Sequence, residues 1–200
     1  MKKRNLSILL ASVSLAVFLF FLVTVITDTY LYMDNLGVVI AENRNGFWVG
    51  FFKVFTHLGS VYFMAGVSVI LLIFDKDKKL AISVAVCLAV VGLLNLFVKL
   101  AVARPRPDYA LMQEVGKSFP SGHSMISVCF YGYIGYLMFN AKTIFKWFYA
   151  IVASVFVLLL GFSRVYLGVH YLSDVLAGFC LGVVVLVVFV AVYHNLRYKK

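Results

Sequence analysis

The chain has 200 residues, of which 64% are hydrophobic and only 13% are charged. A soluble domain carries about 25% charged residues, so this composition excludes an ordinary soluble protein. The formal net charge of +10 could suggest a nucleic-acid partner. However, the basic residues lie at the ends of apolar runs and not on one surface, and we expect no nucleic-acid binding.

Apolar runs long enough to cross a bilayer recur along the chain, since about 20 residues suffice for one crossing. We therefore expect an all-α, polytopic membrane protein that forms a single domain over residues 1–200. Six transmembrane helices are predicted, at Leu6–Ile26, Thr56–Phe74, Leu80–Leu100, Ser121–Asn140, Trp147–Phe162 and Leu172–His194.

Two segments between the first and second spans have distinct compositions. Residues 28–42 form a more polar connection, and Phe47–Phe55 is rich in aromatic residues, which favours a position at the outer membrane boundary. The three cysteines, Cys87, Cys129 and Cys180, are far apart in apolar runs. We expect them to be small buried residues, with neither a disulfide framework nor a zinc site.

The distribution of lysine and arginine predicts the orientation of the chain. Six spans place both termini on one side, and basic residues are enriched in cytoplasmic segments. The segments assigned to the inside hold eleven of the 18 basic residues: Lys2, Lys3, Arg4, Lys76, Lys78, Lys79, Lys142, Lys146, Arg197, Lys199 and Lys200. Both termini are therefore expected in the cytoplasm. Three polar stretches of the chain, at residues 99–107, 120–123 and 163–174, then lie together on the outer face.

The last polar stretch, residues 163–174, joins two long apolar runs and yet holds an arginine, a histidine and an aspartate. His170 and Asp174 are four residues apart, so on a helix they would share one face. The carboxylate could then accept a hydrogen bond from one ring nitrogen and leave the other free to attack. Arg164 offers a fork of donors that suits a phosphate group.

The middle stretch is Pro120-Ser121-Gly122-His123. We expect a helix to begin at or just after Ser121, and the unpaired N–H groups of its first turn make an anion site. Gly122 permits close approach of a ligand, and His123 could donate a proton there. For this stretch alone, a capping serine followed by an incidental histidine explains the pattern as well.

The first stretch begins with Lys99, near the end of an apolar span, and continues with Arg104-Pro105-Arg106-Pro107. A charge at that depth usually pairs or faces a cavity. A lysine that reaches the headgroups, followed by a basic loop that touches anionic lipid, is the alternative explanation.

Taken together, the three stretches favour phosphoryl transfer. Two histidines, only one of which has a carboxylate partner, suit a nucleophile and a general acid, and cations hold the phosphate oxygens. The acids near the site are too few to hold magnesium or calcium, so we expect the cations to take the role of a metal, with no metal and no cofactor. The cations concerned are Lys99, Arg106 and Arg164.

These motifs resemble those of the type 2 phosphatidic acid phosphatase family, the integral-membrane lipid phosphatases. That signature is lysine, six residues, arginine-proline; then proline-serine-glycine-histidine; then serine-arginine, five residues, histidine, three residues, aspartate. The matching residues are Lys99, Arg106 and Pro107; Pro120 to His123; and Ser163, Arg164, His170 and Asp174. Every spacing fits, whereas Arg104 falls outside the pattern and is interpreted as a headgroup contact or a charged residue at the rim.

The resemblance implies a mechanism and a set of roles. His170 would be the nucleophile that forms a phosphohistidine, Asp174 would orient it, and His123 would be the general acid and would later help to activate water. Phosphate binding would fall to Lys99, Arg106, Ser121, Gly122 and Arg164.

The small size and short loops resemble the bacterial members, which act on the outer face of the plasma membrane. Their substrates are phosphatidylglycerol phosphate, phosphatidic acid, diacylglycerol diphosphate or undecaprenyl diphosphate. We thus expect a membrane lipid phosphate as the substrate and the bilayer as the partner. Two alternatives remain: a phosphotransferase with the same site, and a non-catalytic lipid carrier. The sequence leaves the oligomeric state open.

Overall fold

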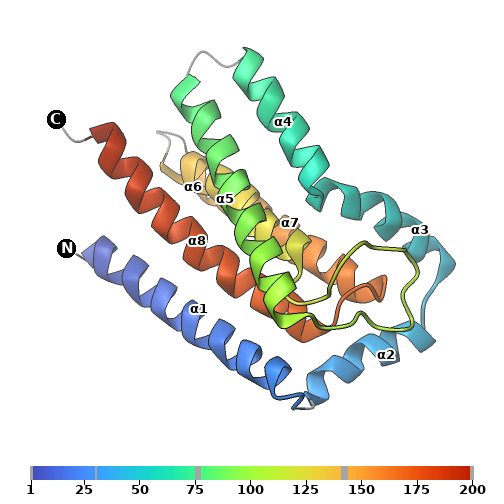
Figure 1. The fold of residues 1–200 in the computed structure, drawn as a ribbon. Coiled ribbons are helices and arrows are strands. Elements are labelled where there is room, and N and C mark those ends of the chain that lie inside the picture. The colour runs from blue at the N-terminus through green and yellow to red at the C-terminus, as the bar shows by residue number, and fades with distance from the viewer. Residues whose placement is uncertain (1, 30, 75–77, 141–143, 199–200) are drawn as a thin grey trace.

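The computed structural model describes residues 2–29, 31–74, 78–140 and 144–198. Throughout this described part the regular structure is helical, which confirms the all-α prediction (Figure 1). The elements are α1 Lys2–Ile26, η1 Tyr32–Asp34, α2 Asn35–Glu42, α3 Gly46–Phe55, η2 Thr56–Gly59, α4 Val61–Phe74, α5 Lys78–Val102, α6 Gly122–Asn140, α7 Lys146–Tyr166 and α8 Leu172–Tyr198.

Four of the described helices are long and apolar enough to cross a membrane. They contain the segments Arg4–Ile26, Ala81–Val102, Lys146–Tyr166 and Leu172–Tyr193. The helical segments Gly46–Gly59 and Val61–Phe74 are long and apolar enough only when they are taken together, with a bend of 47° between them. The described residues therefore form a multi-pass helical protein with four or five candidate spans by length and composition, and six spans were predicted.

The predicted second span, Thr56–Phe74, differs most from the structure. Its first four residues form the short turn η2, and Ser60 is extended with ψ of 147°, so α4 starts only at Val61. The 14 residues of α4 are shorter than the roughly 20 that a straight crossing needs. The aromatic segment Phe47–Phe55 lies within helix α3.

Helix α6 lies at the centre of the bundle, in contact with α5, α7 and α8. Its residues include serines, tyrosines and glycines that lower its hydropathy, and this explains why it is missing from the candidate spans. Gly178 and Gly182 of α8 let the two helices approach closely, because a Cβ at either position would lie 2.7 or 2.8 Å from a carbonyl oxygen of α6 or its N-cap. Gly66 and Gly92, by contrast, face open space.

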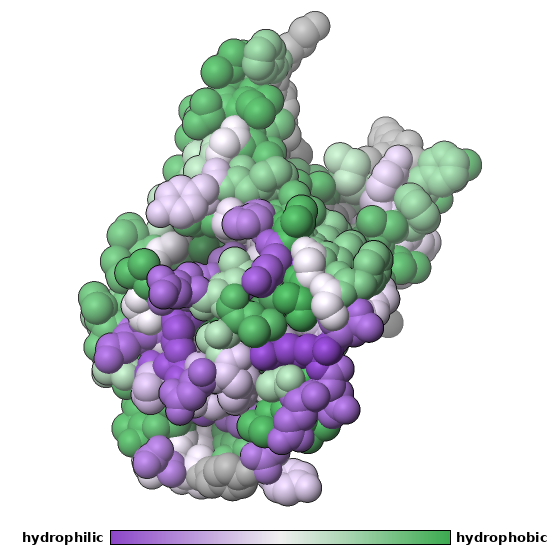
Figure 2. Space-filling view, turned by 90° about the vertical axis from the view of Figure 1, so that its right-hand side faces the viewer, coloured by the Kyte–Doolittle hydropathy of each residue, from purple (hydrophilic) through white to green (hydrophobic). Residues whose placement is uncertain are grey.

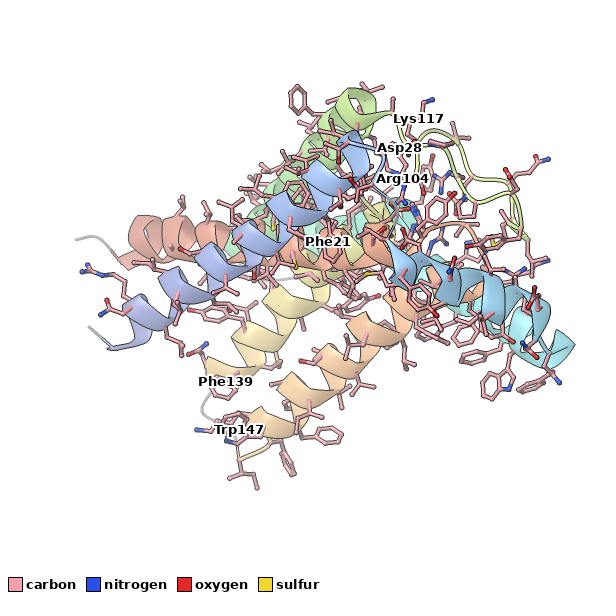
Figure 3. The ribbon with its side chains drawn as sticks, turned by 90° about the horizontal axis from the view of Figure 1, so that it is seen from below. Phe21, Asp28, Arg104, Lys117, Phe139 and Trp147 are labelled. Atoms are coloured by element: carbon pink, nitrogen blue, oxygen red, sulfur yellow. The ribbon has the colours of Figure 1, made fainter. Side chains whose placement is uncertain are left out.

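The two ends of the bundle differ. Helix α1 begins and α8 ends at one end, while α2, α3, the long connection between α5 and α6, and the α7–α8 turn gather at the other (Figure 1). Hydrophilic side chains cluster on that second end (Figure 2). Asp28, Arg104 and Lys117 lie there, away from Phe139 and Trp147, whose rings pack together with centroids 4.8 Å apart (Figure 3).

Several residues used to predict the orientation are outside the described part of the chain, namely Lys76, Lys142, Lys199 and Lys200. Cys87 and Cys129 are buried as predicted, whereas Cys180 is only half-buried, and all three are free thiols.

Candidate active site

The turn between α7 and α8 sets the position of His170. Helix α7 ends with Gly168 in the left-handed region at φ 72°, where its N–H donates to the Val165 carbonyl at 2.9 Å. The next N–H, of Val169, reaches back to the Arg164 carbonyl at 3.1 Å. This pair of bonds is a Schellman motif, which needs glycine at its left-handed position. His170 follows immediately and is held in the turn.

His170 therefore lies before α8 and not on it, so His170 and Asp174 do not share one helix face, as they would if both were helical. The two side chains still meet, with Nδ1 of His170 3.4 Å from Oδ2 of Asp174. Asp174 is in the first turn of α8 and accepts a hydrogen bond from the Tyr171 N–H at 3.0 Å, as in a capping box. The cap thus fixes the carboxylate beside the imidazole.

A third residue, Ser118, mediates this contact and was missed at the level of sequence. Its hydroxyl donates to Oδ2 of Asp174 at 2.5 Å and lies 3.3 Å from Nδ1 of His170. Ser118 is fully buried, like Asp174. Its position two residues before Pro120 was the only signal in the sequence, and nothing there distinguished it from the other serines of the chain.

Arg106 approaches His170 from the other side of the ring. Its Nη1 lies 3.3 Å from Nε2 of His170 and donates to the Val169 carbonyl at 2.8 Å. Its Nε and Nη2 donate to the carbonyls of Gly116 and Val115 at 3.0 and 3.3 Å. Arg106 thus links the α5–α6 connection to the α7–α8 turn, and places a cation beside the ring nitrogen that is free to attack.

Lys99 and Arg164 bring two more cations to the same region. The Lys99 ammonium group donates to the carbonyls of Lys117 and Ser118. Arg164 is fully buried; its Nη1 donates to the Thr56 hydroxyl at 2.6 Å and its Nη2 to the Glu114 carboxylate. Within the described residues, Nε of Arg164 is buried without a hydrogen-bond partner. A buried N–H donor of this kind fits a ligand whose oxygens accept hydrogen bonds, such as phosphate.

The N-terminus of α6 follows the sequence prediction. Ser121 precedes the helix, its own N–H donates to the Asp174 carbonyl at 3.0 Å, and its hydroxyl accepts a bond from Ser124 at 3.0 Å. Gly122 opens α6, and a Cβ there would lie 3.0 Å from Oδ1 of Asn95. His123 follows in the first turn, with its ring against Gly59 of η2.

These groups are close enough to interact electrostatically. His123 couples to Arg164, His170 and Arg106, and Lys99 couples to Arg106, Asp174 and Arg164. Burial lowers the pKa of His170 well below its usual value, and Lys99, Arg164 and Arg106 add to this effect. The structure thus brings all three predicted stretches together, with a neutral imidazole among the cations.

Arg104, which the sequence suggested as a headgroup contact or a rim residue, pairs with two carboxylates in the structure. Its Nη1 donates to Oδ1 of Asp174 at 2.6 Å, and its Nη2 donates to Oδ2 of Asp34 at 2.8 Å. Burial alone would lower the pKa of Arg104, but Asp174 and Asp34 raise it above the usual value. Within the described residues, no group of three or more histidines, cysteines and acids is arranged to hold a metal ion.

Together the fold and the composition define a multi-pass helical membrane protein. The chain belongs to the PAP2 superfamily, whose family model matches residues 80–198. This is the family that the three motifs indicated. The crystal structure of a transmembrane PAP2-type phosphatidylglycerolphosphate phosphatase from Bacillus subtilis has a TM-score of 0.77 and 31% identity, over 94% of this chain and 98% of that one.

Two curated relatives are similar in sequence. Phosphatidylglycerophosphatase B of Bacillus subtilis (strain 168) is 40% identical over 136 residues, which cover 64% of this chain and 66% of the relative. Undecaprenyl-diphosphatase of Sulfolobus acidocaldarius is 32% identical over 131 residues, which cover 62% of this chain and 60% of the relative. The chain therefore spans slightly less than two thirds of each of these relatives.

Proposed function

We propose that this chain is a lipid phosphatase that removes the terminal phosphate from a membrane lipid phosphate or diphosphate without a metal ion. The observation that carries this proposal is the meeting of His170 with Asp174 on one side and Arg106 on the other. The relatives support it, because their names specify phosphatidylglycerol phosphate or undecaprenyl diphosphate as substrates. Phosphatidic acid and diacylglycerol diphosphate present a similar terminal phosphate.

In the first step, Nε2 of His170 attacks phosphorus, and the bond from phosphorus to the leaving oxygen breaks. His123 donates a proton to that oxygen, so that an alcohol or a lipid monophosphate leaves. The N–H at Nδ1 faces Ser118 and Asp174, which stabilise the positive charge that develops on the imidazole. The product of this step is a phosphohistidine.

In the second step, His123 takes a proton from water, whose oxygen attacks the phosphohistidine and releases inorganic phosphate and neutral His170. Lys99, Arg106 and Arg164, with Ser121 and the Gly122 amide, hold the equatorial oxygens in both steps. These fixed donors lie where charge collects in the transition state, and for that reason the cations can replace a metal ion.

The orientation proposed for the chain has six crossings, both termini in the cytoplasm and the site outside. It counts the bent pair Gly46–Gly59 and Val61–Phe74 as one crossing and α6 as another, besides the four apolar helices. Two observations support it: the hydrophilic end is opposite the start of α1 and the end of α8 (Figures 1 and 2), and Lys78, Lys79 and Lys146 lie away from that end. A bacterial plasma membrane is the proposed location, and residues 1–200 are proposed to act as one domain.

A labelling experiment tests this orientation. Val115 is 99% exposed in the α5–α6 connection, and Ile144 is 88% exposed at the opposite end. In intact cells, an impermeant maleimide should label Val115→Cys and should label Ile144→Cys only after the cells are lysed. The reverse pattern would contradict an outward-facing site.

The proposed reaction is tested by phosphate release from the purified protein in detergent with excess EDTA. Phosphatidylglycerol phosphate, phosphatidic acid and undecaprenyl diphosphate are offered side by side. Release should survive EDTA and should vanish in His170→Ala and His123→Ala variants that elute as the wild type does. Phosphate that appears on another lipid or sugar would indicate a phosphotransferase, and no turnover of any lipid by folded protein would favour a carrier.

A further inference from the structure

Asp174 uses its two carboxylate oxygens for different partners. Oδ2 lies at the nucleophile, where it contacts Ser118, the Tyr171 N–H and Nδ1 of His170. Oδ1 faces away from this cluster and accepts a hydrogen bond from Arg104 at 2.6 Å. The charge of Asp174 is therefore shared between His170 and a guanidinium group that the proposed mechanism does not use.

Arg104 in turn is held by a second buried carboxylate. Asp34, which is only 8% exposed, accepts bonds from Nη2 of Arg104 at 2.8 Å and from the N–H and hydroxyl of Ser173 at 2.9 and 2.8 Å. Ser173 also accepts a bond from Nη1 of Arg104 at 2.8 Å, and the guanidinium carbon stacks 4.0 Å from the centre of the Tyr171 ring. Arg104 is thus fixed on three sides.

Asp34 comes from a distant part of the chain. It lies in η1, between α1 and α2, outside the segment 80–198 that matches the family model. Through Ser173 and Arg104 it binds the first turn of α8, the turn that presents Asp174. The burial of a carboxylate costs free energy unless its charge is compensated. The three hydrogen bonds that Asp34 accepts, one of them from Arg104, provide this compensation.

We propose that Asp34 and Arg104 are positioning residues, which set the orientation of Asp174 and the share of its negative charge available to His170. This inference rests on the proposed role of His170 as the nucleophile. The positive charge of Arg104 weakens the interaction between Asp174 and His170. The negative charge of Asp34 compensates in part for Arg104, because Asp34 pairs with it. Neither residue touches the substrate phosphate in this scheme; both act through Asp174.

The scheme predicts opposite effects for two charge-removing variants. In Asp34→Asn, Arg104 binds Asp174 more strongly, the imidazolium form of His170 is less stabilised, and the pKa of His170 falls. In Arg104→Gln, Asp174 is available to His170 alone, and the pKa of His170 rises. Because these charges act on the imidazole through Asp174, we expect the pKa of His170 to shift by only about 0.5 pH units in each direction.

Other charged groups face His170 and are the same in all these variants. They are Lys99 on α5, Arg106 in the α5–α6 connection, His123 on α6, Arg164 on α7 and Asp174 on α8. The contributions of the four groups other than Asp174 therefore cancel when variants are compared with the wild type, and the remaining difference in the titration of His170 is the changed influence of Asp174.

The experiment is a pH titration of the purified full chain in detergent micelles, followed by NMR of ¹⁵N-labelled histidine. The chain has four histidines, and the His170 signal is assigned by its loss in His170→Gln. Asp28→Asn is the matched control, since Asp28 lines the same cavity of 680 Å³ as Asp34 and Arg104, and its φ of 51° suits asparagine. Asp34→Glu, which restores the charge, should bring the His170 titration back toward that of the wild type.

Kinetics provide the second readout. Asp34→Asn should lower kcat about tenfold and leave KM nearly unchanged, in line with the effect of outer partners on buried histidines.

A downward shift of the His170 titration in Asp34→Asn, absent from Asp28→Asn, supports the inference. No shift, or an upward one, overturns it, even if Arg104→Gln does not fold. An inactive wild type would contradict the proposed function. The NMR titration would still test whether Asp34 and Arg104 act on His170 through Asp174.

Discussion

Nη1 of Arg106 lies 3.3 Å from Nε2 of His170, while Asp174 approaches the other ring nitrogen, Nδ1, at 3.4 Å. The imidazole therefore has a carboxylate at one nitrogen and a guanidinium at the other. A phosphate attacked by Nε2 would be within reach of the guanidinium as soon as the substrate binds. This arrangement is the basis for the predictions below.

Replacement of Arg106 by lysine should reduce kcat/KM by about two orders of magnitude, because a single ammonium group cannot bond the carbonyls of Val115, Gly116 and Val169 and also face the phosphate. The measurement is phosphate release from phosphatidic acid as a function of its concentration. Lys117→Gln, an exposed cation of the same connection, is the control and should change kcat/KM less than twofold. Equal effects of the two substitutions would contradict a specific role for Arg106.

Replacement of Ser118 by alanine should lower kcat about tenfold with little change in KM. The hydroxyl bridges Asp174 and His170, and its loss leaves a buried carboxylate oxygen with one donor fewer. Ser118→Thr retains the hydroxyl and should recover part of the rate. Ser154→Ala, which removes an exposed hydroxyl bonded to the Ala150 carbonyl of α7, provides the comparison. Full activity of Ser118→Ala would exclude a positioning role for this residue.

The low pKa of His170 makes stability depend on pH with a definite sign. In the unfolded chain the histidine takes up a proton near pH 6.5, whereas the buried imidazole stays neutral well below that value. The unfolded state therefore binds more protons in this window, and stability falls as the pH falls below 6.5. Compared with His170→Gln, the wild type should lose up to about 1.4 kcal/mol more per pH unit.

The measurement is thermal unfolding in detergent at pH 7, 6 and 5. Because His123 is present in both proteins, the difference between their pH profiles isolates His170. Parallel profiles would show that His170 is not buried in its neutral form.

Replacement of Gly178 by alanine should destabilise the protein by about 1–3 kcal/mol, since the added Cβ would lie 2.7 Å from the Ser121 carbonyl and force α8 away from α6. The same change at Gly92, which has no atom within 4 Å of the added Cβ, should stabilise α5 by about 0.5–1 kcal/mol. The midpoint of thermal unfolding checks both. Gly178→Ala should also lower activity, because Ser121 begins the helix that carries His123.

The sequence was sufficient to predict the three stretches of the site because each carries its chemistry in a short motif next to an apolar run. It could not reveal the network behind them. Asp34 and Ser173 are 139 residues apart, and no local pattern distinguishes a buried acid in a polar connection from an exposed one. Arg104 looked like a rim residue for the same reason: its partners come from two distant segments.

The helices were also predictable to different degrees. Uniform apolar runs such as Ala81–Val102 were predicted to within a few residues. The bend of 47° between Gly46–Gly59 and Val61–Phe74 was not, because the chain is extended at Ser60 and no proline or glycine pair in the sequence marks that position as a break. The last helix was predicted to begin at Leu172, as α8 does, but the Schellman turn at Gly168 that holds His170 before it was not predicted.

The most direct test of the central proposal is to trap the phosphorylated enzyme. The protein is mixed with ³²P-labelled phosphatidic acid in the presence of EDTA, quenched in alkali, and digested for mass spectrometry. The proposal predicts an alkali-stable, acid-labile phosphate on the peptide that contains His170, and neither label nor turnover in His170→Ala. Label on another residue, or phosphate release by His170→Ala at the wild-type rate, would contradict it.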